Sequence, residues 1–261
     1  MRVANRNISI TKLLSQGFTF VKALPYLLIV VKRPIICLKY YIQCKSPEYI
    51  DLKGEKKILF SSHPHDLITF FVVFLKRDYG RVKKDSIIID IGANIGVFSL
   101  YAALSGAKKV YAIEPSLEAF NVLCENIRIN HLENVIIPFN KAISNIDNDV
   151  VRFPRSSSPY NRINNSQCTS NQTEYQEVQT MTVNALLDNN NILDVDLLKM
   201  DCEGAEFDII PSLNENSMAR IKEIRMECHG DPNQLIDRLV SNGYVVVKKK
   251  QKNVWLSKPF T

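Results

Sequence analysis

The sequence predicts an α/β protein built on a doubly wound, mostly parallel β-sheet, and three observations carry this prediction. Residues 87–98 join a run of β-branched apolar residues to a glycine-spaced turn and then to the start of an amphipathic helix. Predicted strands then alternate with helices of about 10–15 residues, as in parallel βαβ units. An acidic residue, Glu114, ends the second strand of this series.

The turn within residues 87–98 is the expected ligand-binding corner. A continuous apolar strand is typical of a parallel sheet that is covered on both faces. Gly92 and Gly96 let the backbone turn tightly and approach a ligand without interference from a Cβ. Free N–H groups at the start of the following helix face the same place, and doubly wound sheets bind ligands there.

The ligand class follows from residues around this turn. Glu114 comes 22 residues after Gly92, where a carboxylate can accept hydrogen bonds from both hydroxyls of an adenosine ribose. A nicotinamide dinucleotide fingerprint needs glycines where this chain has Asn94 and Val97, and no Gly-Lys-Ser/Thr of a Walker loop follows. The turn therefore suits a nucleoside without a pyrophosphate. Asp-x-Gly-x-x-x-Gly followed by a distal acid is the pattern of S-adenosylmethionine sites.

The other predicted elements complete a seven-stranded sheet with an antiparallel C-terminal strand. We expect strands at 109–113, 135–139, 195–200, 222–228, 244–249 and 254–257, and helices at 97–105, 116–130, 182–187 and 232–242. Ala142 follows the third strand, and we assign it to the cofactor site. Before this core, residues 49–61 predict a hairpin, and Asp66 is expected to cap a helix over 67–75.

Acidic residues and a histidine follow the fourth and fifth strands. Asp201 and Glu203 come directly after residues 195–200, and Glu227 and His229 lie at the end of 222–228. Ligands bind beyond the carboxyl ends of parallel strands, which predicts catalytic roles for all four. His229 is a reasonable general base by its ordinary pKa. Two plainer interpretations stay open: acids at a solvated helix start, and a turn histidine bonded to the backbone.

The N-terminal 48 residues form a basic leader, and residues 49–261 form the predicted catalytic domain. Residues 1–84 carry 16 Lys and Arg against 5 acids, whereas the remainder carries 17 against 22. Apolar residues recur at helical spacing over 13–28. This helix either caps the catalytic domain or lies on an anionic membrane surface. The apolar stretch 23–31 is too short to span a bilayer.

Several features give weaker indications. Six cysteines without paired spacing favour a reducing, cytoplasmic location, with the inner membrane face as an alternative through the leader. His63 and His65 lack further ligands in the sequence, so we expect no metal site. Within the polar insert 145–180, Arg152, Arg155 and Arg162 with Tyr160 either contact an acidic or sugar substrate or belong to a solvated loop.

Five motifs resemble the FkbM-type methyltransferase family. They are Ile-Asp-Ile-Gly-Ala-Asn-Ile-Gly (89–96), Tyr-Ala-Ile-Glu-Pro-Ser (111–116), Glu-Asn-Ile-Arg-Ile-Asn (125–130), Leu-Lys-Met-Asp-Cys-Glu-Gly-Ala-Glu (198–206) and Met-Glu-Cys-His (226–229). The resemblance covers about residues 85–248 and implies a class I S-adenosylmethionine-dependent methyltransferase with a Rossmann-like fold. Carried over by motif, it places Asp90, Gly92, Asn94, Gly96 and Glu114 at the cofactor, and Asp201 and Glu203 at the active site.

The expected reaction is O-methylation of a hydroxyl on a sugar, glycan or secondary metabolite. Asp201 or His229 would take the proton, and Glu203 would assist. One alternative is N-methylation of RNA or protein, although no Asn/Asp-Pro-Pro-Tyr/Phe follows the fourth strand. The basic leader lacks a nucleic-acid-binding motif, so nucleic acid is not the expected partner. The other alternative is a non-catalytic module at a membrane surface.

Overall fold

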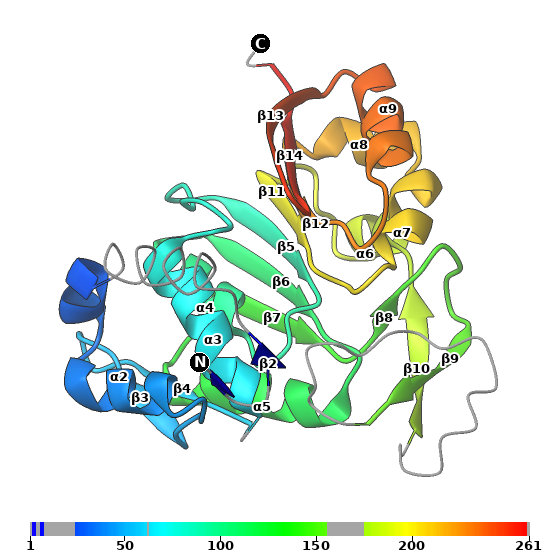
Figure 1. Cartoon of the computed structure of the whole chain (residues 1–261). Coiled ribbons are helices and arrows are strands. Elements are labelled where there is room, and N and C mark those ends of the chain that lie inside the picture. The colour runs from blue at the N-terminus through cyan, green and yellow to red at the C-terminus, as the bar shows by residue number, and fades with distance from the viewer. Residues whose placement is uncertain (1, 4–5, 8–23, 62, 156–174, 260–261) are drawn as a thin grey trace. The chain divides into compact units, whose positions relative to one another are not determined.

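The computed structural model describes residues 2–3, 6–7, 24–61, 63–155 and 175–259 (Figure 1). The chain divides into two compact units, residues 1–80 and 81–261. The boundary that we expect between the basic leader and the catalytic domain, after residue 48, stays a prediction. Most of the amphipathic stretch 13–28 lies outside the described residues.

The first unit contains short helices and two hairpins. Its bounded elements are β1 (Arg2–Val3), β2 (Arg6–Asn7), α2 (Pro34–Ile42), β3 (Tyr49–Asp51), β4 (Lys57–Leu59), α3 (Pro64–Phe70) and the π-helix η1 (Phe71–Lys76), and residues 24–30 are also helical. Strands β3 and β4 pair antiparallel, which confirms the expected hairpin. Among the described residues, no helix combines the length and the apolar character that a bilayer crossing requires.

The expected cap of α3 is wrong. His63, not Asp66, occupies the N-cap position: its backbone is extended, and its Nδ1 accepts a hydrogen bond from the N–H of His65 at 3.3 Å. Asp66 lies in the first turn, where its carboxylate accepts hydrogen bonds from the N–H and hydroxyl of Ser61 at 2.7 and 2.8 Å. An acid in the first turn also suits the helix dipole, so sequence position alone could not separate the two roles.

The second unit is organised around one seven-stranded sheet. Its strand order is β13-β14-β12-β11-β5-β6-β7 (Figure 1). The strands are β5 (Ile87–Ile91), β6 (Lys109–Ile113), β7 (Ile136–Phe139), β11 (Leu197–Met200), β12 (Glu223–Glu227), β13 (Val245–Lys250) and β14 (Asn253–Ser257). Strands β12, β11, β5, β6 and β7 run parallel, and β14 is antiparallel to both β12 and β13. The predicted fold class is confirmed.

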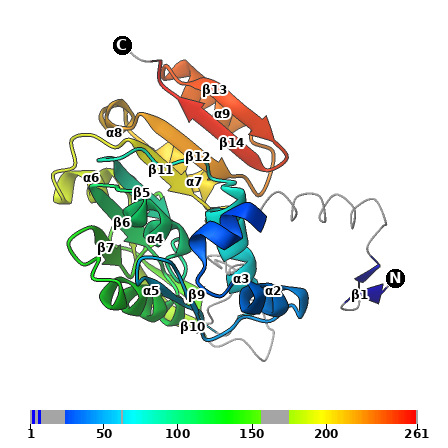
Figure 2. The same ribbon diagram turned by 90° about the vertical axis from the view of Figure 1, so that its left-hand side faces the viewer.

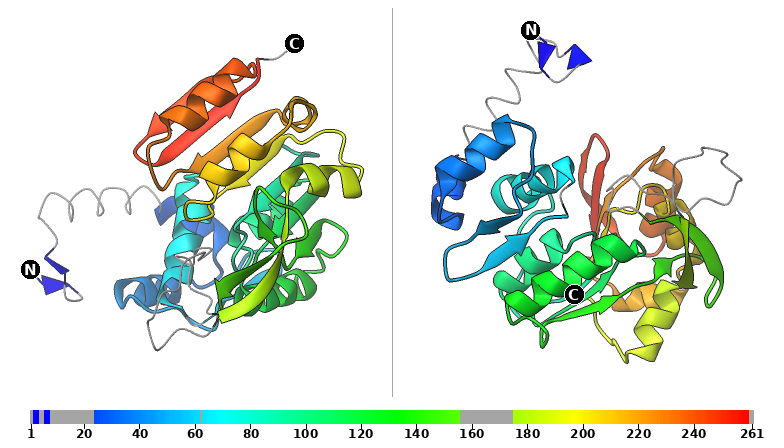
Figure 3. Two further views of the ribbon diagram at one scale, coloured as in Figure 1. Left: turned by 90° about the vertical axis from the view of Figure 1, so that its right-hand side faces the viewer. Right: turned by 90° about the horizontal axis from the view of Figure 1, so that it is seen from below.

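Helices cover both faces of this sheet (Figures 1 and 2). They are α4 (Val97–Leu104), α5 (Leu117–Ile129), α6 (Val183–Asn189), α7 (Glu206–Ser212), α8 (Glu215–Arg220) and α9 (Asn233–Ser241). Helices α4 and α5 lie on one face, and α6 to α9 lie on the other (Figure 3). Both Ile88 and Ile89 of β5 are fully buried because each face is covered, as the apolar run predicts. Helices α7 and α8 were not predicted from the sequence.

A smaller three-stranded sheet lies between β7 and α6 in the chain. It consists of β8 (Ala142–Ile143), β10 (Tyr175–Met181) and β9 (Val150–Pro154), in that order. Its three strands each contribute one residue to a small buried apolar cluster: Ala142, Phe153 and Val178. The polar insert thus contains β9 and most of β10, and residues 156–174 between them, with Tyr160 and Arg162, lie outside the described residues.

Candidate active site

The glycine turn follows β5 at the point where the strand order of the sheet reverses. Gly92 has a φ of +73°, and a Cβ added there would overlap the backbone oxygen of Asp201 on the neighbouring strand end. Gly96 has a φ of +88° and is the N-cap of α4. Asn94, between them, also has a positive φ of 50°. This conformation explains why glycine recurs here, and it brings the backbone close to the end of β11.

Glu114 is bound into the same turn from the end of β6. Its carboxylate accepts hydrogen bonds from the N–H groups of Asn94 (2.7 Å) and Ser116 (2.8 Å). Only 6% of the residue is exposed. Burial raises the pKa of Glu114 to about 7, against the lowering effect of those two N–H groups and of Lys199. The acid is therefore held at the position that the sequence predicted, beside the glycine turn.

Asp90 supports the turn from beneath. Its carboxylate is fully buried, accepts a hydrogen bond from the Ser99 hydroxyl at 2.6 Å and lies 2.9 Å from the Lys199 ammonium. Lys199 also donates to the carbonyl oxygen of Gly92 at 3.0 Å. Burial alone would lower the pKa of Lys199, but the attraction of Asp90 and then Asp201 leaves it raised. The ion pair thus connects β5, β11 and the glycine turn.

A pocket of about 570 Å³ opens over the turn. Its lining residues come from the carboxyl ends of the parallel strands and from the small sheet: Ile91, Gly92, Asn94, Ile113, Glu114, Pro115, Ala142, Ile143, Phe153, Asp201, Cys202, Glu203 and Ala205. Gly92, Asn94, Glu114 and Ala142 are four of the six residues assigned to the cofactor. The other two, Asp90 and Gly96, do not line the pocket, because one is buried in the ion pair and the other begins α4.

Phe153 is a pocket residue that was not expected from the sequence. Phe153 of β9 is buried and reaches the pocket from the small sheet. It follows Arg152, which is exposed and lies over the ring of Tyr175 with its guanidinium carbon 5.6 Å from the ring centroid. Neither Arg152 nor Arg155 lines the pocket. The alternation along β9 indicates an inward position at 153, but only the tertiary structure shows which site it faces.

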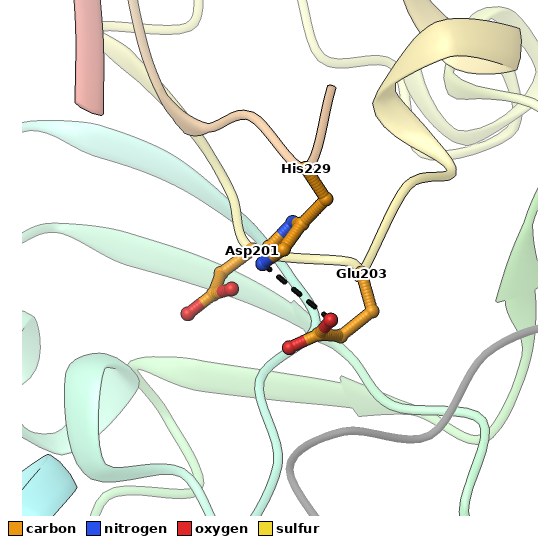
Figure 4. Close-up of side chains that lie close together, drawn as sticks. All are labelled: Asp201, Glu203 and His229. Carbon is orange, nitrogen blue, oxygen red and sulfur yellow. Dashed lines mark ion pairs between the residues drawn. The ribbon is translucent and has the colours of Figure 1, made fainter. Parts of the chain in front are cut away.

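The four predicted catalytic residues lie together at the carboxyl ends of β11 and β12. Asp201 and Glu203 line the pocket. The imidazole Nε2 of His229 lies 3.4 Å from Glu203 Oε2 (Figure 4). The same nitrogen lies 3.8 Å from Glu227 Oε1. Burial, followed by the charge of Asp201, raises the pKa of Glu227. Glu203 has a φ of 53°, a conformation that is uncommon for a residue with a long side chain and that recurs at functional sites.

Glu206 joins the two loops that carry these groups. It is fully buried, and its carboxylate accepts hydrogen bonds from the N–H of His229 at 2.6 Å and the N–H of Gly204 at 2.9 Å. The backbone of His229 is therefore bonded to a side chain, whereas its ring faces the carboxylates. This arrangement does not match the interpretation of His229 as a turn residue whose ring is bonded to the backbone.

Residues 90–246 match the family model described as the methyltransferase FkbM domain, which is more than half of the chain. The chain belongs to the FkbM methyltransferase family. The resemblance in the sequence motifs is confirmed, and S-adenosylmethionine is the cofactor of this FkbM domain. The pocket fits this molecule, because Glu114 offers the ribose a hydrogen-bond acceptor and Gly92, which has no side chain, lines the pocket beside it.

Individual proteins are similar over shorter stretches. The tRNA (guanine(37)-N(1))-methyltransferase Trm5b of Methanocaldococcus jannaschii is 36% identical over 67 residues, which cover 26% of this chain and 19% of that protein. The ribosomal protein L11 methyltransferase of Citrifermentans bemidjiense is 31% identical over 98 residues, or 34% of this chain and 32% of that protein. The chain thus matches a fifth to a third of the length of these two relatives.

One solved structure is also similar to this chain. The M. capricolum TrmK structure in complex with S-adenosyl-homocysteine matches with a TM-score of 0.42 and 15% identity, covering 67% of this chain and 62% of that one.

Ribose binding by the FkbM domain is expected to depend on pH. Glu114 is protonated below its raised pKa of about 7 and then offers the ribose hydroxyls a weaker acceptor. Adenosine affinity should therefore rise by about tenfold between about pH 6 and pH 8, following the ionised fraction. Calorimetry with adenosine, which does not titrate in this range, measures the effect. Glu114→Gln should remove the pH dependence, and an unchanged slope in that variant would contradict the assignment.

Proposed function

We propose that this protein transfers a methyl group from S-adenosylmethionine to a hydroxyl oxygen of a sugar, glycan or other small molecule. The observation that carries the proposal is the convergence of Asp201, Glu203 and His229 at the edge of the cofactor pocket. The sulfonium of the bound cofactor supplies an already activated methyl group. The protein then has to align the acceptor hydroxyl and remove its proton. Asp201 or His229 takes this proton, and Glu203 holds the imidazole.

The acceptor side of the site supports an uncharged, hydroxyl-rich substrate. A second hollow of about 870 Å³ shares Ile143, Cys202, Glu203 and Ala205 with the cofactor pocket. Its other polar side chains are Ser144, Asn145, Asp149 and Asp208, and no Lys or Arg is among the described residues that line it. Carboxylate and amide oxygens accept hydrogen bonds from hydroxyl groups, and the carboxylates repel the phosphates of RNA.

A second candidate is N-methylation of protein. The same carboxylates would attract a cationic side chain, and a protein arginine N-methyltransferase of Oryza sativa is 41% identical over 64 residues of this chain. The matched tRNA methyltransferase makes RNA another candidate acceptor. The expectation that nucleic acid is not the partner therefore has no support from this relative.

Label transfer distinguishes these acceptors. With methyl-labelled cofactor and cell fractions, we expect label in a fraction that resists nuclease and protease. Asp201→Asn should slow transfer by about 10²–10⁴-fold, the usual contribution of a general base, while cofactor affinity changes by less than about tenfold. Asp231→Asn, an equivalent change at an exposed position, is the control. Label that disappears with nuclease or protease would instead establish RNA or protein as the acceptor.

A further inference from the structure

Asp201, Glu203 and His229 form a donor set that the sequence did not suggest. Each offers one ligand atom, and the three atoms lie within 4.8 Å of one another (Figure 4). The residues come from the ends of two adjacent parallel strands. Met200 pairs with Met226 in register, so the segments that follow β11 and β12 leave the sheet side by side.

The histidine is oriented as a metal-binding histidine would be. Its side chain is only 4% exposed, and its Nε2 faces the carboxylate of Glu203 at 3.4 Å. The other ring nitrogen, Nδ1, is buried, makes no hydrogen bond and lies 3.5 Å from the Oε1 of the fully buried Glu206. In metal sites a carboxylate commonly accepts the second ring N–H, which fixes the tautomer and directs the free nitrogen to the ion.

The carboxylates are held in place by the backbone. Glu203 adopts a positive φ of 53°, and Gly204 follows it with a φ of 111°. Glu206 fixes both ends of this arrangement through the N–H groups of Gly204 and His229. Rigid placement of ligands before an ion arrives is a general requirement of a metal site, and it explains why uncommon backbone conformations occur at this position.

We propose that Asp201, Glu203 and His229 bind a divalent cation of the Mn²⁺ type at the edge of the cofactor pocket. Two carboxylate oxygens and one imidazole nitrogen suit Mn²⁺ or a similar first-row ion better than Ca²⁺, which prefers oxygen ligands alone. Asp201 and Glu203 also line the cofactor pocket, and Glu203 lines the neighbouring hollow that we assign to the acceptor. This inference replaces the sequence-based expectation of no metal.

The proposal rests on the proposed function for the role of the ion but not for its binding. With the three groups engaged as ligands, neither Asp201 nor His229, the two bases named for the site without an ion, is available to take the proton. Glu227, whose Oε1 lies 3.8 Å from His229 Nε2, then remains as the carboxylate placed to accept the proton.

Direct titration tests the binding. The full chain is freed of metal with a chelator and titrated with MnCl₂, and bound Mn²⁺ is followed by electron paramagnetic resonance and calorimetry. We expect one site that is lost in Glu203→Gln and His229→Asn, and Glu206→Gln should weaken Mn²⁺ binding by about 10–100-fold through the histidine. The matched control is His131→Asn, an exposed histidine whose positive φ of 54° asparagine tolerates. Near-UV circular dichroism checks that each variant is folded.

The outcomes separate this proposal from the proposed function. No Mn²⁺ binding by the unaltered chain, or equal affinity in the folded His229→Asn and His131→Asn variants, would overturn the metal site. Methyl transfer to a hydroxyl that persists in chelator would overturn the role of the ion in the reaction and leave the proposed function intact. Site-specific Mn²⁺ binding together with label only in protein or RNA would support the metal site and refute a sugar, glycan or other small molecule as the acceptor.

Discussion

Replacing Glu114 with alanine is expected to lower the affinity for S-adenosylmethionine by about 10²–10⁴-fold, because two hydrogen bonds from the ribose to a carboxylate are worth about 1.5–3 kcal/mol each. The carboxylate is already oriented by the N–H groups of Asn94 and Ser116, so no reorganisation is needed when the ribose binds. Isothermal titration calorimetry with the cofactor measures the loss.

Two further variants make this result specific. Glu114→Gln keeps one acceptor oxygen for the turn and should lose less affinity than the alanine variant. Glu133→Ala, at an exposed position of the same unit, should bind the cofactor normally. The circular dichroism spectrum should be unchanged in all three. An unaltered affinity in Glu114→Ala would show that the pocket holds the cofactor by other groups.

Replacing Lys199 with methionine is expected to reduce the free energy of unfolding by about 3–5 kcal/mol, because it leaves the carboxylate of Asp90 buried without its cation. Both side chains are almost fully buried, at 4% and 0% exposure, and water cannot replace the lost partner. The change also removes the donor to the carbonyl oxygen of Gly92, so cofactor affinity should fall as well. Denaturant unfolding measures the stability.

A double substitution tests the physical cause. If the penalty is the unpaired charge, Asp90→Asn combined with Lys199→Met should recover part of the stability lost in the single variant. Arg128→Met, which breaks an exposed ion pair with Glu125, should have a far smaller effect. A double variant that is less stable than Lys199→Met alone would argue against the charge as the cause.

The main elements of the second unit were predictable because their determinants are local. Residues 87–91 contain only apolar residues apart from Asp90, and a strand covered on both faces demands that composition. Ser116 caps α5 by accepting a hydrogen bond from the N–H of Ala119, as a serine before an amphipathic stretch indicates. Helices α7 and α8 were missed because they are short, and Pro211 lies inside α7.

The candidate site was predictable only in part. Glu114, Asp201 and His229 follow predicted strands, and parallel strands present their carboxyl ends at one edge of a sheet. Asp90 was assigned to the cofactor by its motif, yet its side chain lies beneath the turn in an ion pair. The side chain of Lys199 on the neighbouring strand points toward Asp90, and only the packing of β5 against β11 determines this direction. A motif places a residue along the chain, whereas the direction of its side chain depends on packing.

By itself, the sequence determined the parallel sheet, the glycine turn and the FkbM family, since each depends on residues that are close together in the chain. Only the tertiary structure decided that Asp201, Glu203 and His229 meet, because this requires β11 and β12 to pair in one particular register. It also decided that Glu206 orients the histidine from within the core. A shift of that register by one residue would move the segment after β12 by about 3.3 Å relative to the segment after β11 and separate these side chains.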